Sequence, residues 1–174
     1  MKRLNIFRHK QNFQKQKVFR LMILEDNELF NDILTRQLEH YTAMLAMERN
    51  CSFEIHSYTS SNDFIRNLRN DTDIAFIDYF LENGITGSDI IKKINERCWE
   101  CKIIIVSQIR NIRTKLLSDE AVDFVFKDIN ALPQCCIILE DAVDSNFLAL
   151  QSSLNYLHSP LKTPVSPKST PTIV

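Results

Sequence analysis

The chain has 174 residues, of which 44% are hydrophobic and 25% are charged, a composition ordinary for one globular domain with a full-sized core. No apolar run approaches the roughly 20 residues needed to span a bilayer, and no apolar stretch with a cleavage site follows the basic N-terminus. We therefore expect no membrane span, no secretory signal and a cytoplasmic location.

Charge is distributed unevenly. Residues 1–17 carry six basic and no acidic residues, whereas residues 18–158 hold thirteen basic and all 22 acidic residues, a net charge of -9 that disfavours nucleic-acid binding. We expect residues 1–17 to form a disordered basic arm, although contact with a membrane surface or an acidic partner is the alternative. Residues 158–174 hold four of the five prolines and are expected to be a disordered tail. The domain between them covers 18–147, and its last helix can continue to 157.

The first part of the domain shows strand and helix signals in alternation. Val18–Leu24 is mostly apolar and ends in the acidic pair Glu25–Asp26, and apolar residues then recur at helical spacing over 29–41. Apolar and polar residues alternate over 53–58, as in a half-exposed edge strand. The polar cluster 60–63 predicts the start of a short second helix.

The stretch from Asp73 to Asp89 organises the chain. Four apolar residues, Ile74–Ile77, are followed at once by Asp78 and then by a loop with the only two glycines, Gly84 and Gly87. A continuous apolar run of this kind is typical of a parallel strand buried on both faces. Asp78 is therefore predicted to end a buried strand, at the edge of the sheet where ligands bind in open α/β folds.

The remaining elements continue the alternation. They are a third helix capped by Ser88 or Asp89, a buried strand over Ile103–Val106, a brief fourth helix marked by Ile112, Leu116 and Leu117, a strand over 124–126, and a fifth helix from Leu132 to Phe147. Five strand–helix pairs predict an α/β fold with a doubly wound, five-stranded parallel sheet. The alternating second strand fits an edge, which gives the order 2-1-3-4-5 and a switch point between strands one and three.

This topology brings polar side chains to one edge of the sheet. Glu25 and Asp26 would face Asp78 across the switch point, and carboxylates so close together are unfavourable unless a cation lies between them. Mg²⁺ suits such a site because it takes carboxylates, a backbone carbonyl and waters, and leaves room for phosphate oxygens. Ser107 and Lys127 end the fourth and fifth strands and would bring a hydroxyl and a cation to the same edge.

Over residues 18–147 this combination resembles the response-regulator receiver domain of two-component and phosphorelay signalling, in its single-domain form. The receiver family has a flavodoxin-like fold, an acidic pair after strand one, Asp after strand three, Ser or Thr after strand four and Lys after strand five. The resemblance implies these roles: Asp78 as phosphoacceptor; Asp26, Asp78 and the Phe80 backbone carbonyl as Mg²⁺ ligands, with Glu25 in the outer shell; Ser107 and Lys127 as phosphoryl-binding groups; and Phe124 as the switch aromatic.

The resemblance also implies a function. The domain would be a phosphoprotein that catalyses only its own phosphorylation and dephosphorylation, and so would not be an enzyme in the ordinary sense. Its phosphoryl donor would be a histidine kinase or a phosphotransfer protein. Its output would be a protein partner bound through the face of the fourth helix, fifth strand and fifth helix. A homodimer is compatible with the sequence.

Two departures from the family pattern keep an alternative open. Asp128 follows Lys127 where the family usually has proline, and the loop after Asp78 lacks the usual proline and has one extra residue. A degenerate receiver that acts as a phosphate-independent protein-binding adaptor is therefore the alternative. A haloacid-dehalogenase-like phosphatase is disfavoured because Phe80 stands where that family needs a second Asp, and an FMN site is disfavoured because no phosphate-binding loop follows strand one.

The five cysteines are odd in number and scattered, which predicts reduced thiols. Cys98 and Cys101 have C-x-x-C spacing, but the sequence has no second pair of Cys or His residues at the spacing that zinc sites use. We therefore expect this motif to be a packing feature around Trp99 and not a zinc or redox site.

Overall fold

A computed structural model of the chain describes residues 16–112 and 122–157, with side chains as far as Ala149, so the expected arm and tail lie almost wholly outside the described residues. Its centre is a parallel sheet in the order β2-β1-β3-β4-β5, as predicted. The α/β fold class is therefore confirmed. The strands are β1 (Lys17–Leu24), β2 (Cys51–Tyr58), β3 (Ile74–Asp78), β4 (Lys102–Ser107) and β5 (Val122–Phe126).

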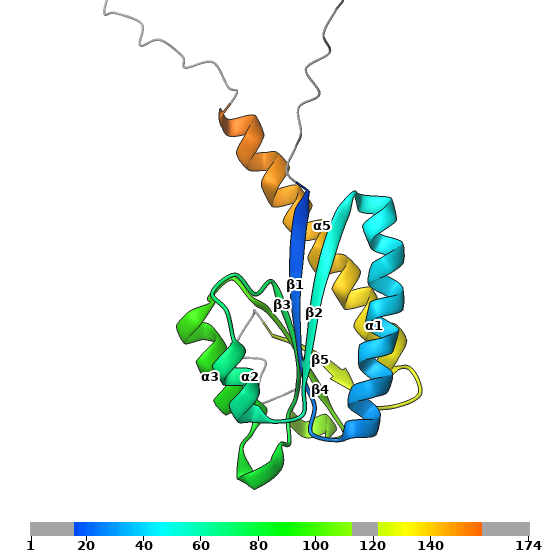
Figure 1. Cartoon of the computed structure of the whole chain (residues 1–174), viewed down its shortest axis with the longest axis vertical. Coiled ribbons are helices and arrows are strands. Elements are labelled where there is room, and N and C mark those ends of the chain that lie inside the picture. Colours follow the sequence, from blue (N-terminus) through cyan, green and yellow to red (C-terminus); the bar gives the residue numbers. More distant parts are fainter. Residues whose placement is uncertain (1–15, 113–121, 158–174) are drawn as a thin grey trace, which may run out of the picture.

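Helices cover both faces of the sheet. The elements are α1 (Glu28–Arg49), α2 (Ser61–Asn67), α3 (Gly87–Arg97) and α5 (Ala131–Leu157), with short 3-10 turns η1 (Glu82–Gly84) and η2 (Arg110–Ile112). Figure 1 shows α1 and α5 on one face, α2 and α3 on the other, and α5 continuing past the amino-terminal edge of the sheet. Of the predicted fourth helix, Ile112 lies in η2, and Leu116 and Leu117 fall outside the described residues.

The core forms one layer on each side of the sheet. Side chains of alternating parity from β1, β3 and β4 pack under α1 and α5 on one face, and the others pack under α2 and α3. All five residues of β3 are buried, which explains its continuous apolar sequence up to Asp78. The strand that ends in Asp78 is thus covered on both faces up to the carboxyl edge of the sheet.

Each of the helices α1, α2 and α3 begins after a short polar residue that caps its N-terminus, and for α3 this residue differs from the predicted one. Asn27 accepts a hydrogen bond from the Phe30 N–H at 2.9 Å and caps α1, and Ser60 caps α2 as its cluster predicted. The predicted cap of α3 by Ser88 or Asp89 is wrong: Thr86 is the N-cap, and the Asp89 carboxylate accepts from the Thr86 N–H at 3.0 Å and hydroxyl at 2.8 Å.

The C-x-x-C motif packs differently from the prediction. Trp99 is 79% exposed, so the expectation that the motif packs around it is wrong. Cys98, at the end of α3, and Cys101, just before β4, are themselves buried, and the Cys98 thiol donates to the Thr72 carbonyl at 3.0 Å. All five cysteines are free thiols, as expected. Among the described helices, none combines the length and apolarity that crossing a membrane requires.

Candidate functional site

The turn after β1 is fixed by backbone and amide hydrogen bonds. The Glu25 N–H donates to the Tyr58 carbonyl at 3.1 Å, which joins the ends of β1 and β2. The buried Asn31 amide donates to the carbonyls of Glu25 at 3.0 Å and Tyr58 at 2.9 Å. Sequence reasoning missed Asn31, although a polar residue between apolar positions of an amphipathic helix was the available signal.

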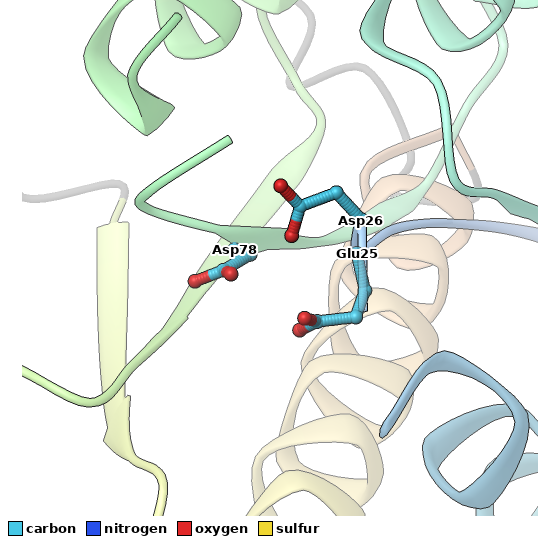
Figure 2. Close-up of side chains that lie close together, drawn as sticks. All are labelled: Glu25, Asp26 and Asp78. Atoms are coloured by element: carbon cyan, nitrogen blue, oxygen red, sulfur yellow. The ribbon is translucent and has the colours of Figure 1, made fainter. Parts of the chain in front are cut away.

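Three carboxylates meet at the carboxyl edge of the sheet. Glu25 and Asp26 follow β1, Asp78 ends β3, and one oxygen of each lies within 4.8 Å of the others. Figure 2 shows the three side chains together, two from the turn after β1 and one from the end of the neighbouring strand. Glu25 is 1% exposed and Asp78 8% exposed, whereas Asp26 is only half-buried. The sequence predicted this juxtaposition.

Lys127, just after β5, lies between two of these carboxylates. Its ammonium nitrogen is 2.6 Å from Glu25 Oε2 and 2.9 Å from Asp78 Oδ2. The same nitrogen is 4.8 Å from the centroid of the Phe30 ring, within cation–π range. The pairing of Lys127 with Glu25 was not predicted, because it depends on side-chain positions that strand order alone does not define.

One ammonium cannot fully compensate two buried carboxylates. Burial raises the pKa of Glu25 to about 7, and the neighbouring charge of Asp78 adds to this effect, while the Lys127 ammonium opposes it. Apart from the Lys127 ammonium, Glu25 Oε2 has no polar partner among the described residues. The site therefore holds an excess of negative charge that a further cation would stabilise.

The donor set at this edge fits Mg²⁺. Carboxylate oxygens come from Asp26 and Asp78, and Glu25 stands behind them. In the loop after β3, the Tyr79 carbonyl accepts from Gly87 N–H at 2.7 Å, and Leu81 N–H donates to Ile85 at 3.1 Å. Among the described residues, no backbone hydrogen bond outside the helices and strands ends on the Phe80 carbonyl. A hard oxygen set of carboxylates and one free carbonyl is the kind that Mg²⁺ takes.

Ser107 occupies the end of β4, fully buried. Its hydroxyl oxygen accepts from the Ile109 N–H at 3.3 Å, and its carbonyl accepts from the Lys127 N–H at 2.8 Å. A backbone hydrogen bond thus joins Ser107, which carries the hydroxyl, to Lys127, which carries the ammonium. Both groups stand at the same edge as Asp78, where the sequence placed them.

Three aromatic or aliphatic side chains lie near these polar groups. Phe124 in β5 is half-buried opposite Ile105 and packs against the core layer under α2 and α3. Phe80 and Ile109, each two residues beyond a strand end, are 48% and 45% exposed. Both side chains therefore present apolar surface to solvent in the loops that follow Asp78 and Ser107.

Comparison with known proteins identifies the fold. No protein-family model matches the chain, and no curated protein matches it. Among solved structures, a response regulator receiver domain protein from Clostridium thermocellum is 18% identical, with a TM-score of 0.58, over 75% of this chain and 98% of that one.

Two structures from Thermotoga maritima are similar to the same degree. The response regulator TrrA, in complex with Mg²⁺-BeF, is 17% identical with a TM-score of 0.57, over 71% of this chain and 98% of that one. The response regulator DrrB, an OmpR/PhoB homologue, is 16% identical with a TM-score of 0.56, over 71% of this chain and 54% of that one. The chain therefore has the receiver-domain fold and spans about half of DrrB.

Proposed function

We propose that this protein is a response-regulator receiver domain that accepts a phosphoryl group on Asp78. The observation that carries the proposal is the placement of Asp78, with the Lys127 ammonium 2.9 Å from one of its oxygens and the carboxylates of Glu25 and Asp26 close by. A nucleophile flanked by one cation and by ligands for a second one suits phosphoryl transfer. The fold shared with receiver domains supports the same function.

The chemistry follows from the side chains. A carboxylate oxygen of Asp78 attacks the phosphorus of a phosphohistidine in a histidine kinase or phosphotransfer protein. The new O–P bond forms as the P–N bond breaks, and the imidazole leaves with the electron pair. Lys127 is placed to stabilise negative charge on the phosphoryl oxygens, and the Ser107 hydroxyl can turn from its contact with Ile109 to donate a hydrogen bond to one of them.

Asp26, Asp78 and the Phe80 carbonyl would hold Mg²⁺, with Glu25 in the outer shell. When bound, Mg²⁺ neutralises charge on the transferring phosphoryl group. The excess negative charge around Glu25 and the free Phe80 carbonyl support this assignment. The complex of TrrA with Mg²⁺-BeF supports it by analogy of fold.

Phosphorylation of Asp78 would then change the conformation of the neighbouring strands β4 and β5. It adds a charge of about -1.5 to -2 at Asp78. Movement of Ser107 toward the phosphoryl oxygens would free space that the half-buried ring of Phe124 can fill. Such a shift would alter the surface around β5 and α5, where a downstream protein partner would bind.

The direct test is intact-mass spectrometry after incubation with acetyl phosphate, with and without Mg²⁺. Wild type should gain one phosphoryl group only with Mg²⁺, and Asp78→Asn should gain none. Asp123→Asn is the matched control, because Asp123 lies on β5 in a surface ion pair with Lys102. The absence of any adduct in wild type, together with the absence of Mg²⁺ binding, would favour the phosphate-independent adaptor instead.

A further inference from the structure

The two residues that flank Lys127 share one contact, the side chain of Arg110. The Arg110 guanidinium carbon is 4.0 Å from the centroid of the Phe126 ring. Its Nη2 atom is 4.0 Å from Asp128 Oδ2. Arg110 lies in η2, beyond β4, so this side chain reaches from the loop that follows Ser107 to both neighbours of Lys127.

Asp128 also sets the turn into α5. Its Oδ1 atom accepts a hydrogen bond from the Asn130 N–H at 2.8 Å, and its carbonyl accepts from the Ala131 N–H at 3.0 Å. One carboxylate oxygen thus fixes the start of α5 while the other faces Arg110. Asp128, which stands where the family has proline, therefore helps to hold the conformation of this loop.

Lys127 needs such support because of its chemistry. An ammonium on a four-carbon stem has many rotamers, and here it must stay aligned with Asp78 while Glu25 competes for it at 2.6 Å. The backbone of Lys127 is held by its bond to Ser107, and the Arg110 contacts hold the residues on either side.

We infer that Arg110 is a positioning residue for Lys127: by bracing Phe126 and Asp128 it aims the ammonium at the phosphoryl group. The inference rests on the proposed function, in which Lys127 binds that group. Arg110 is 74% exposed at its side chain, so each contact is weak by itself, and the effect comes from restricting the loop. Loss of Arg110 should therefore slow phosphorylation without unfolding the protein.

The test compares variants of the full chain by two measurements. The first is the rate of phosphorylation by acetyl phosphate at fixed Mg²⁺, which Arg110→Ala should lower by roughly three- to fivefold. The second is the ¹H–¹⁵N NMR signal of the Lys127 ammonium without any phosphoryl donor, which Arg110→Ala should shift or broaden. Arg110→Lys keeps a cation over Phe126 and should restore most of both. Asp128→Asn keeps the acceptor for Asn130 and should give a smaller effect.

Arg66→Ala is the matched control, because Arg66 is an equally exposed arginine paired with Asp63 at 3.2 Å on α2. Thermal midpoints of both alanine variants equal to that of wild type would show that folding is intact. If Arg110→Ala matched Arg66→Ala in both rate and NMR signal, the inference would be overturned. If wild type accepted no phosphoryl group but the Lys127 signal still moved in Arg110→Ala, the proposed function would fail and the positioning role would stand.

Discussion

At the scale of single residues, Glu25 is a carboxyl group of the site whose ionisation the fold opposes. Burial raises its pKa to about 7, above the ordinary value of 4.5. Between these two values the folded state binds more protons at this site than the unfolded state does. The contribution of Glu25 to stability is therefore most favourable below pH 4.5 and is lost as the pH rises through about 7.

This gives a prediction for the metal-free protein. The free energy of unfolding, measured by urea denaturation in EDTA, should fall less between pH 5 and 7.5 in Glu25→Gln than in wild type, because the amide cannot ionise. Glu96→Gln is the control, since Glu96 forms only an exposed pair with Lys93. The same pH dependence in wild type and Glu25→Gln would contradict the assigned pKa.

The side chains of Phe80 and Ile109 are expected to affect the lifetime of the acyl phosphate on Asp78. Phe80 lies two residues beyond Asp78 and Ile109 two residues beyond Ser107, and both side chains are about half-exposed. We expect them to keep water from the acyl phosphate, so Phe80→Asn should shorten its half-life several-fold, measured by loss of the phosphorylated mass after the donor is removed. A longer half-life in Phe80→Asn than in wild type would contradict this shielding role.

At the scale of elements, the loop after β3 depends on its two glycines for different reasons. Gly84 adopts a φ of +73°, which favours glycine, and a Cβ there would meet nothing within 4 Å. Gly87 opens α3, where a Cβ would lie 3.1 Å from the Tyr79 Cα and 3.2 Å from the Ile105 side chain. The Tyr79 backbone cannot easily yield, because its carbonyl accepts from the Gly87 N–H at 2.7 Å.

We therefore predict that Gly87→Ala destabilises the protein by about 1–3 kcal/mol, as measured by urea unfolding. Gly84→Asn should cost less, because asparagine tolerates a positive φ and the space is open. Equal stability of Gly87→Ala and wild type would contradict the tight packing of Gly87 against Tyr79 and Ile105.

The same elements show what the sequence could and could not predict. Apolar runs and the alternation over 53–58 were enough to predict five strands and their order, because buried and edge strands differ in periodicity. The cap of α3 was misplaced because Thr86, Ser88 and Asp89 are all capping residues, and the choice among them depends on how Gly87 packs. Packing of the C-x-x-C motif around Trp99 was expected because the motif lacks a second pair of metal ligands, yet the Trp99 side chain is exposed to solvent.

The candidate site also has features that the sequence could predict and features that it could not. The meeting of Glu25, Asp26 and Asp78 follows from strand order, so it could be predicted. The sharing of Lys127 between Glu25 and Asp78 and the reach of Arg110 to Asp128 are choices of side-chain rotamer, which no periodicity encodes.

At the scale of the whole molecule, Mg²⁺ should act as a stabilising ligand. It would bind carboxylates that come together only in the folded chain, so it should raise the free energy of unfolding by about 2.7 kcal/mol at roughly 100 times its Kd. Removal of the ion with EDTA should reverse the gain. Thermal unfolding with and without Mg²⁺ tests this, and Asp26→Asn should lose most of the gain. An equal gain in Asp26→Asn would place the ion elsewhere.

Whether Asp78 carries the phosphoryl group can be tested by mapping the modified residue. Hydroxylamine converts an acyl phosphate into a hydroxamate, which marks the modified residue for peptide mass spectrometry. After treatment with acetyl phosphate and Mg²⁺, we expect a hydroxamate at Asp78 in wild type and in Asp123→Asn. A hydroxamate at Glu25 or Asp26, or a stable phosphate on a hydroxyl group with Asp78 unmodified, would contradict it.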